Sequence, residues 1–223
     1  MQLRDNLESL SKDSLVTKGI NLNDIPGVYS YEKYSPTEAL AKANIISQET
    51  YSHEDIFGSY CTVCEYIQCP VDIAFEYAAN IHSLEEWTFS MRQLKHVGDG
   101  LYKGLDYLAK DTFIYARVEA YPDTGVIDYP CAWDQGEELW MRYHFRFLDA
   151  MPTLRKPGTV MFWTNCKHPY YDRDVTDVPE YITEARKRTD RIWVGDFWPK
   201  FYIGHLLEAR NLKAILEYRF ANA

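Results

Sequence analysis

Between residues 59 and 167 the hydrophobic and polar positions alternate in short runs, a pattern that predicts β-strands. The first run, 59–69, ends at Pro70, and a helix with apolar residues at steps of three and four follows over 70–81. A second short helix is predicted from Ser83 to Trp87. Turn residues separate the later runs, as is typical of antiparallel strands joined by tight turns. These runs cover residues 91–97, 111–121, 125–133, 139–148 and 159–167.

Beyond Pro179 the periodicity becomes helical. Residues 180–197 form one helical stretch, Pro199 interrupts it, and residues 200–220 predict a long C-terminal helix. Strands followed by one terminal helix indicate an α+β fold in which the helix buries its apolar stripe on the concave face of an antiparallel sheet.

Residues 1–58 are a mixed polar stretch. Ser35 is expected to cap a short helix there, with Pro36 at its first position. We therefore expect two parts: an N-terminal extension, 1–58, packed on a main domain of residues 59–223.

Composition narrows the classes of function. The chain has 24 Lys and Arg against 33 Asp and Glu, a formal charge of −9, which argues against a nucleic-acid partner and against an anionic membrane surface. It has no apolar run of 18 residues or more and no apolar segment near residue 1 that would serve as a secretory signal. Together with five irregularly spaced cysteines, this favours a reduced, cytoplasmic compartment. Cys61 and Cys64 lie in a predicted strand, where side chains three apart point to opposite faces, so buried thiols are expected rather than a metal or redox pair.

Aromatic residues are abundant at 15% of the chain. Such side chains suit either the wall of a pocket for a ring-shaped ligand or a β-rich core. The run 139–148 places Met141, Tyr143 and Phe145 on one face, which we expect to line a cavity, and His144 on the outer face. Tyr143 is then a candidate hydrogen-bond donor to a carbonyl group.

Two polar residues interrupt the apolar stripe of the last helix. At 100° per residue from Phe201, His205 lies at about 40°, Glu208 at about 340° and Leu212 at about 20°. If the stripe faces a cavity, both polar groups face it, and their burial is costly unless they bind each other, a ligand or a metal. They could act as a general acid and base. Alternatively they are a structural pair, or Glu208 pairs with a cation such as Arg117 or Arg142.

Two segments carry a resemblance to a known superfamily. They are CEYIQCPVDIAFEYAANIHSLEEWTFSMRQLKHVGDG (64–100) and TGVIDYPCAWDQGEELWMRYHFRF (124–147). In element order and motifs, residues 59–220 resemble the helix-grip, START-like superfamily, which includes polyketide cyclases and pollen-allergen-like proteins. The resemblance implies an antiparallel sheet wrapped around the C-terminal helix with a deep, mostly apolar cavity between them.

A weaker resemblance is to the phloroglucinol and phloretin hydrolases, zinc-dependent carbon–carbon bond hydrolases of this fold. It is carried by the run His205-Leu-Leu-Glu208-Ala-Arg-Asn211-Leu212, although that family places its His and Glu four residues apart rather than three. It implies a zinc site formed by His205 and Glu208 with strand residues, for which Glu119 and His168 are the candidates. We expect Arg117 and Glu119 to face solvent.

The leading hypothesis is an enzyme of specialised metabolism, of the cyclase, dehydratase or lyase type, acting on a hydrophobic aromatic or polyketide-like carbonyl compound. His205 would move protons, Glu208 would orient it and Tyr143 would stabilise an enolate-like oxygen, with no cofactor. The residues expected to bind the substrate are Trp87, Met141, Phe145, Trp163, Phe197, Phe201 and Leu212. The alternatives are the zinc-dependent hydrolase and a non-catalytic carrier of a hydrophobic ligand; a homodimer is compatible with all three.

Overall fold

The computed structural model describes residues 21, 24–28, 33–34, 38, 42, 58–108, 112–134, 138–190 and 192–222. Of the helix expected at Ser35, the structure describes Glu38 and Lys42, which are both helical, and the rest of it lies outside the described residues. Within the predicted extension, Ile25 and Val28 are each 2% exposed and belong to the hydrophobic core. The boundary at residue 58 stays a prediction.

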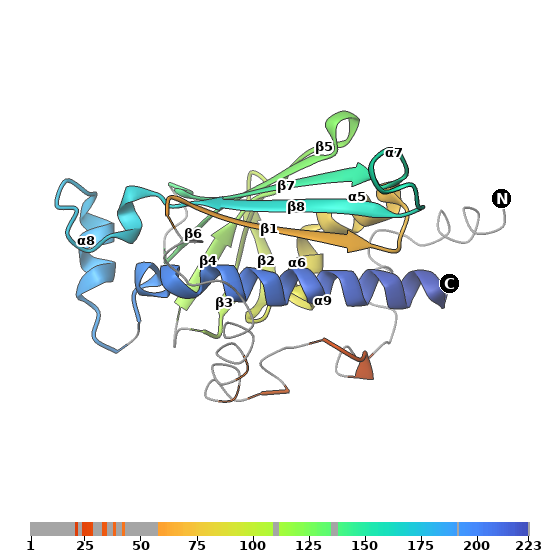
Figure 1. Ribbon diagram of the computed structural model, residues 1–223. Helices are drawn as coiled ribbons and strands as arrows, with labels where there is room; N and C mark the ends of the chain where they lie inside the picture. Colours follow the sequence, from red (N-terminus) through yellow and green to blue (C-terminus); the bar gives the residue numbers. More distant parts are fainter. Residues whose placement is uncertain are drawn as a thin grey trace.

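One antiparallel sheet forms the body of the molecule (Figure 1). Its order is β1-β8-β7-β6-β4-β3-β2, and β5 also pairs with β6. The first strand therefore lies beside the last one. The strands are β1 (Tyr60–Ile67), β2 (Met91–Gly98), β3 (Leu101–Asp106), β4 (Thr112–Ala116), β5 (Glu119–Tyr121), β6 (Val126–Trp133), β7 (Met141–Asp149) and β8 (Thr159–Cys166).

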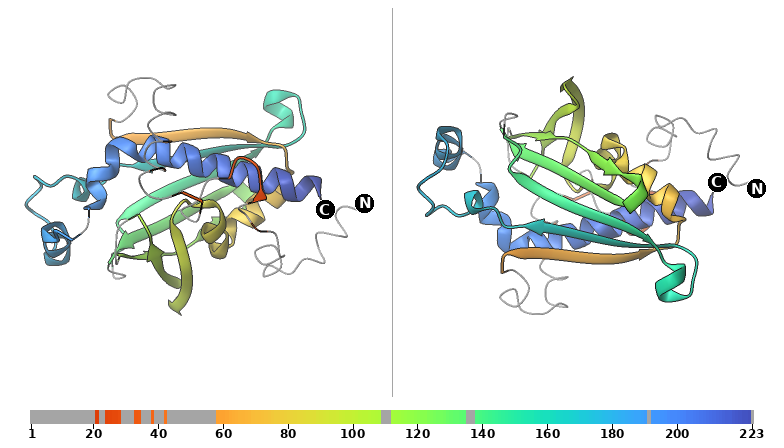
Figure 2. Two further views of the ribbon diagram at one scale, coloured as in Figure 1. Left: turned by 90° about the horizontal axis from the view of Figure 1, so that it is seen from below. Right: turned by 90° about the horizontal axis from the view of Figure 1, so that it is seen from above.

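The C-terminal helix α9 (Phe201–Ala221, 21 residues) runs along the sheet, and Figure 2 shows β1 lying beside it and the green strands of the sheet at an angle to it. This is the predicted helix-grip arrangement, and the fold class is confirmed. The other helical segments are α5 (Val71–Ala79), η2 (Ile81–Ser83), α6 (Leu84–Trp87), η3 (Pro122–Thr124), α7 (Met151–Leu154), η4 (Pro169–Tyr171), α8 (Glu180–Lys187) and η5 (Val194–Lys200).

Two strand predictions need correction. Strand β3 was not predicted. It follows a two-residue turn at Asp99 and Gly100, whose φ values are +48° and +69°, and positive φ at both positions is the type I′ geometry of tight hairpins. The single strand expected over 111–121 is two strands, β4 and β5. Opposite the break lies Pro130, which accepts a hydrogen bond from the Arg117 N–H but has no N–H to return one.

The helix expected over 180–197 is also divided. Helix α8 ends at Lys187, and Trp193 leaves the helical path because its indole is buried and donates a 3.0 Å hydrogen bond to the Tyr171 carbonyl. At Gly195 the backbone comes so close to the same carbonyl that a Cβ would lie 1.8 Å from it. Tertiary packing thus overrides local helix propensity here.

Buried polar contacts fix the C-terminal half of α9. Arg219 donates two hydrogen bonds, of 2.7 and 2.9 Å, to Glu86 of α6, and the Tyr77 hydroxyl of α5 donates a third to the same carboxylate at 2.5 Å. Asn211 donates to the Trp87 carbonyl at 3.1 Å. This end of the helix is therefore tied to α5 and α6.

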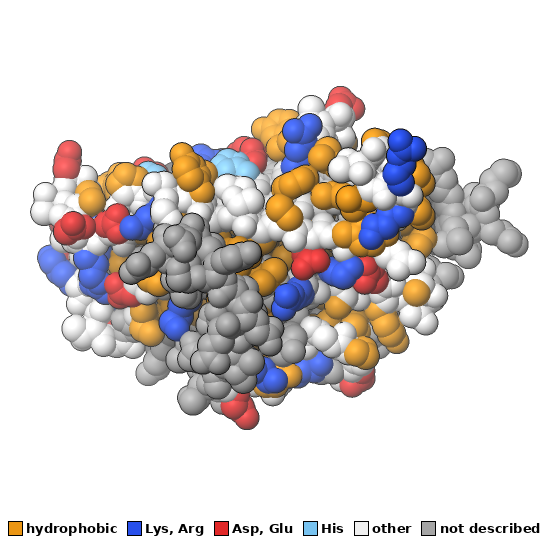
Figure 3. Space-filling model, viewed as in Figure 1, with side chains coloured by type: hydrophobic (Ala, Val, Ile, Leu, Met, Phe, Trp, Pro, Cys, Tyr) orange, Lys and Arg blue, Asp and Glu red, His pale blue; other side chains and the backbone are white. Residues whose placement is uncertain are grey.

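Acidic and basic side chains are interspersed with apolar ones on the face along β1 and α9 (Figure 3). Arg210 with Glu65 and Lys213 with Glu217 form ion pairs between or within these elements. Cys61 of β1 is buried as expected, but Cys64 is exposed on the opposite face, so the prediction of two buried thiols is wrong for Cys64. Among the described helices, none is long and apolar enough to cross a membrane.

Candidate functional site

A cavity of about 360 Å³ lies between the N-terminal half of α9, the concave face of the sheet and the segment from α6 to β2. This volume is within the usual range for small-molecule sites, roughly 300–1,000 Å³. The wall is mainly aromatic and aliphatic. Its polar or ionisable side chains include Thr88, Ser90, Asp106, Cys131, Tyr143, Lys200, His205 and Glu208.

The structure brings almost all of the predicted site residues to this cavity. The lining includes His205, Glu208, Tyr143, Trp87, Met141, Phe145, Trp163, Phe197 and Phe201. Leu212 is the exception, because it is fully buried in the core and is not among the lining residues. His144 lies on the outer face, as predicted, where its Nδ1 is 2.7 Å from Asp128.

His205 sits in an aromatic environment. Its ring centroid is 4.3 Å from that of Trp163, 5.1 Å from Phe201 and 5.4 Å from Tyr143, and its Nδ1 lies 3.5 Å from the Cys61 thiol. Burial lowers the pKa of His205 to about 3. The imidazole is therefore neutral at physiological pH.

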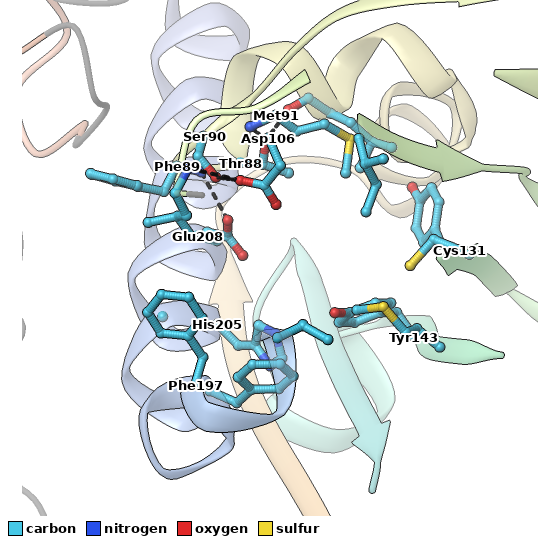
Figure 4. Close-up of a pocket in the computed structure, with 18 of the residues that line it drawn as sticks. Thr88, Phe89, Ser90, Met91, Asp106, Cys131, Tyr143, Phe197, His205 and Glu208 are labelled. Carbon is cyan, nitrogen blue, oxygen red and sulfur yellow. Dashed lines mark hydrogen bonds between the residues drawn. The ribbon is translucent and has the colours of Figure 1, made fainter. Parts of the chain in front are cut away.

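Glu208 lies one turn further along α9 and faces the middle of the cavity (Figure 4). One carboxyl oxygen accepts a 2.8 Å hydrogen bond from the Phe89 N–H. Burial raises the pKa of Glu208 to about 8, and the charge of Asp106 adds to the effect. The expectation that Glu208 orients His205 does not hold, because their hydrogen-bond partners are Phe89 and Cys61. Nor does Glu208 pair with Arg117 or Arg142.

Asp106 was missed by the sequence analysis. It ends β3, and its carboxylate accepts hydrogen bonds from the Ser90 hydroxyl at 2.6 Å and the Leu108 N–H at 3.0 Å. Burial raises its pKa, and its carboxyl group lies near that of Glu208 (Figure 4). The sequence does contain a signal for this residue: Asp106 is an acidic residue at the end of the short run 101–106, which was not predicted to be a strand.

Tyr143 points into the cavity from the opposite wall (Figure 4). Burial raises the pKa of its hydroxyl well above the usual value of 10.0, and the neighbouring Tyr171 contributes to the shift. The hydroxyl therefore remains an O–H donor across the physiological range. A donor and two carboxyl groups thus face each other across an apolar space.

The other expected zinc ligands lie elsewhere. Glu119 is exposed on β5, and His168 packs its ring on Trp140 and Tyr170, with centroids 5.5 and 4.3 Å apart. No group of three or more His, Cys, Asp or Glu side chains that could hold a metal ion occurs among the described residues. The residues in place therefore do not fit the zinc site implied by the hydrolase resemblance, which needs at least three protein ligands.

Comparison with known proteins gives structural neighbours but no family. No family model and no curated protein sequence matches the chain. The Zhui aromatase/cyclase from Streptomyces sp. R1128 is 14% identical, with 71% of this chain and 92% of that one covered and a TM-score of 0.46. DynU16, a protein in the dynemicin biosynthetic locus, is 12% identical over 72% of this chain and 48% of that one, with a TM-score of 0.43.

The Aha1 dimer from Colwellia psychrerythraea is more distant, at 9% identity over 56% of this chain and 83% of that one, with a TM-score of 0.36. At these identities and TM-scores the similarity defines neither a family nor an activity for this chain. A homodimer and a cytoplasmic location therefore stay predictions.

Proposed function

We propose that this protein is an enzyme that binds an apolar aromatic or polyketide-like carbonyl compound in the cavity and catalyses proton-transfer chemistry of the cyclase, dehydratase or lyase type. The observation that carries the proposal is the placement of Glu208. A carboxyl group with a pKa of about 8 faces an apolar cavity, opposite the hydroxyl of Tyr143.

A carboxyl group of this pKa is suited to both directions of proton transfer. Near neutral pH it is mostly protonated and can donate a proton to a leaving hydroxyl group; above about pH 8 it is a carboxylate and can remove a proton from carbon. Tyr143 would donate a hydrogen bond to the substrate oxygen as negative charge develops on it. We therefore assign proton transfer to Glu208 instead of His205, whose conjugate acid is scarce above its pKa of about 3.

His205 would then have a positioning role. Its neutral ring packs against Trp163 and Phe201 and would form part of the surface on which a planar ligand rests. The aromatic walls would hold the substrate carbonyl between Glu208 and Tyr143, where orientation alone can contribute several kcal/mol.

Deuterium exchange into 2-tetralone tests the proposal, since this bicyclic aromatic ketone requires the same elementary step. A proton leaves the carbon between the ring and the carbonyl for the Glu208 carboxylate, and the enolate oxygen accepts a hydrogen bond from Tyr143. The resulting carboxylic acid exchanges its proton with D₂O, and a deuteron then returns from Glu208 to the same carbon, which regenerates the carboxylate. Exchange is followed by NMR in D₂O, with the uncatalysed rate subtracted.

The catalysed rate should rise through about pH 8, as the Glu208 carboxylate forms. Glu208→Gln should remove catalysis and Tyr143→Phe should lower it about 10²–10³-fold, the usual cost of removing one hydrogen-bond donor to a developing oxyanion. Binding of the neutral fluorophore 1-N-phenylnaphthylamine should stay within twofold in both variants, which shows that the cavity is intact.

Two other outcomes would contradict the proposal. Loss of exchange in His205→Gln, with normal fluorophore binding and full activity in Glu208→Gln, would return proton transfer to His205. Fluorophore binding without exchange at any pH would indicate a carrier of hydrophobic ligands.

A further inference from the structure

We propose that the ligand of this cavity is an organic cation: an apolar, ring-bearing molecule whose protonated or quaternary nitrogen lies beside Glu208 and Asp106. The inference rests on the proposed function, which makes the cavity the substrate site, and it specifies the class of substrate.

The wall of the cavity carries an excess of acidic side chains. Two carboxyl groups from different elements, Glu208 of α9 and Asp106 of β3, approach the same part of the cavity (Figure 4). Among the described residues that line the cavity, the basic side chain is Lys200, which is exposed at the end of η5. Within the cavity the balance of ionisable groups is therefore acidic, and a positively charged ligand would compensate it.

Aromatic rings line the same cavity, an observation that is independent of its charge. The indole N–H of Trp133 donates a hydrogen bond to Asp106, which lowers the pKa of that carboxyl group, and the Trp133 ring centroid is 6.5 Å from that of Phe197 in an edge-to-face pair. Phe197 and Phe201 also line the cavity. Aromatic faces attract organic cations, most strongly where water is excluded, and cages of such rings recognise quaternary ammonium groups.

The volume of the cavity restricts the size of the ligand. A bare metal ion would leave most of the 360 Å³ empty and would lack a third ligand among the described residues. An ammonium group attached to an aromatic skeleton would satisfy the carboxyl groups and also cover the apolar wall formed by Trp87, Phe145 and Trp163. The geometry thus favours a nitrogen-bearing apolar molecule.

Such a ligand would change the state of Glu208. Burial disfavours the charged carboxylate, whereas a nearby cation favours it. Binding should therefore release the Glu208 proton and form, at neutral pH, the base that the proposed reaction requires. A cationic substrate would activate its own catalyst.

The other ionisable groups around Glu208 are not expected to release a proton near pH 7 when a cation binds. Arg92 lowers the pKa of Glu208 and Asp106 raises it, with burial the larger influence. His205 is neutral, and burial raises the pKa values of Cys131 and Tyr143, so both stay protonated. Burial raises the pKa of Asp106 as well, but hydrogen bonds from Ser90, the Leu108 N–H and Trp133 and the charge of Arg92 lower it. Proton release near pH 7 is therefore assigned to Glu208, which accepts the Phe89 N–H alone among these donors.

A pair of isosteric probes tests the inference. Phenyltrimethylammonium and tert-butylbenzene have the same shape and differ by one charge, and neither titrates. Their affinities are measured by displacement of 1-N-phenylnaphthylamine between pH 6 and 9, and proton release is measured by calorimetry of the cation in two buffers of different ionisation enthalpy. Glu208→Gln is compared with Glu76→Gln, which removes the same charge from the exposed face of α5.

We expect the cation to bind at least tenfold more tightly than its isostere at pH 9. At pH 7 it should release about 0.9 proton, the protonated fraction of a group with a pKa of about 8, and below pH 7 its affinity should fall about tenfold per pH unit. Glu208→Gln should abolish proton release and lower cation affinity about tenfold, while its affinity for tert-butylbenzene stays within twofold. Glu76→Gln should behave as wild type.

Wild-type protein that binds the cation no better than the isostere, or without releasing a proton, overturns the inference. If 2-tetralone exchange is still catalysed, the proposed function survives that failure. Cation binding with proton release but without exchange supports the ligand class and removes the enzymatic proposal.

Discussion

Glu208 gives a prediction about stability that needs no ligand. In the folded protein its pKa is about 8, against a usual value of 4.5. Below pH 4.5 the carboxyl group is protonated in both the folded and the unfolded states. As the pH rises, the unfolded chain loses this proton first, so the folded state becomes progressively less stable until the pH passes 8.

The size of the effect follows from the shift. Each pKa unit corresponds to about 1.4 kcal/mol, so the full difference is at most about 5 kcal/mol, and water in the cavity lowers it. Glu208→Gln keeps the shape of the side chain and removes its titration. The variant should therefore gain stability relative to wild type between pH 5 and pH 9, by about 3–5 kcal/mol.

Urea unfolding at pH 5, 7 and 9, followed by tryptophan fluorescence, measures this difference. Glu76→Gln is the control for net charge, because Glu76 is exposed on α5. A Glu208→Gln difference from wild type that is the same at pH 5 and pH 9 would refute both the assigned burial of the carboxyl group and the pH argument built on it.

Three further predictions concern stability. Arg219→Met leaves the Glu86 carboxylate buried without its ion-pair partner and should lower the free energy of unfolding by about 3–5 kcal/mol, measured by urea titration at pH 8. Gly195→Ala should lower the melting temperature, because the added Cβ would collide with the backbone carbonyl of Tyr171. Gly204→Ala is the control on helix α9: its added Cβ would have no atom within 4 Å, so it should raise helix stability by up to about 1 kcal/mol. Wild-type stability should also fall as the pH drops from 6.5 toward 3, because His205 is held neutral in the fold with a pKa of about 3; His205→Gln should shift acid unfolding, followed by circular dichroism, to lower pH.

Periodic segments were the most predictable part of the molecule. The stripe of α9 and the alternation along β7 correctly placed His205, Glu208, Tyr143 and Phe145 on the cavity, because helix and strand periods fix which side chains share a face. Leu212 shares the same stripe but lies beyond the cavity, since the stripe is longer than the space it faces.

Contacts between distant segments were not predictable in this way. Strand β3 has a weak apolar pattern and contains Gly104, where a Cβ would lie 2.8 Å from the Arg92 carbonyl. Its omission concealed Asp106. The partner of Glu208 is a backbone N–H at Phe89, more than a hundred residues away in the chain, and no local pattern indicates such a bond.

The pairing of β1 with β8 has a consequence for the order of folding. Tyr60 pairs with Cys166, and α9 packs against β1 as well, so the first strand finds its partners only after most of the chain has been synthesised. Contacts between residues so far apart in the sequence form slowly. Until β1 has paired with β8, its unpaired edge is exposed and can aggregate. The cavity wall combines α9 with strands from the middle of the chain, so the cavity is complete only when α9 has packed on the sheet.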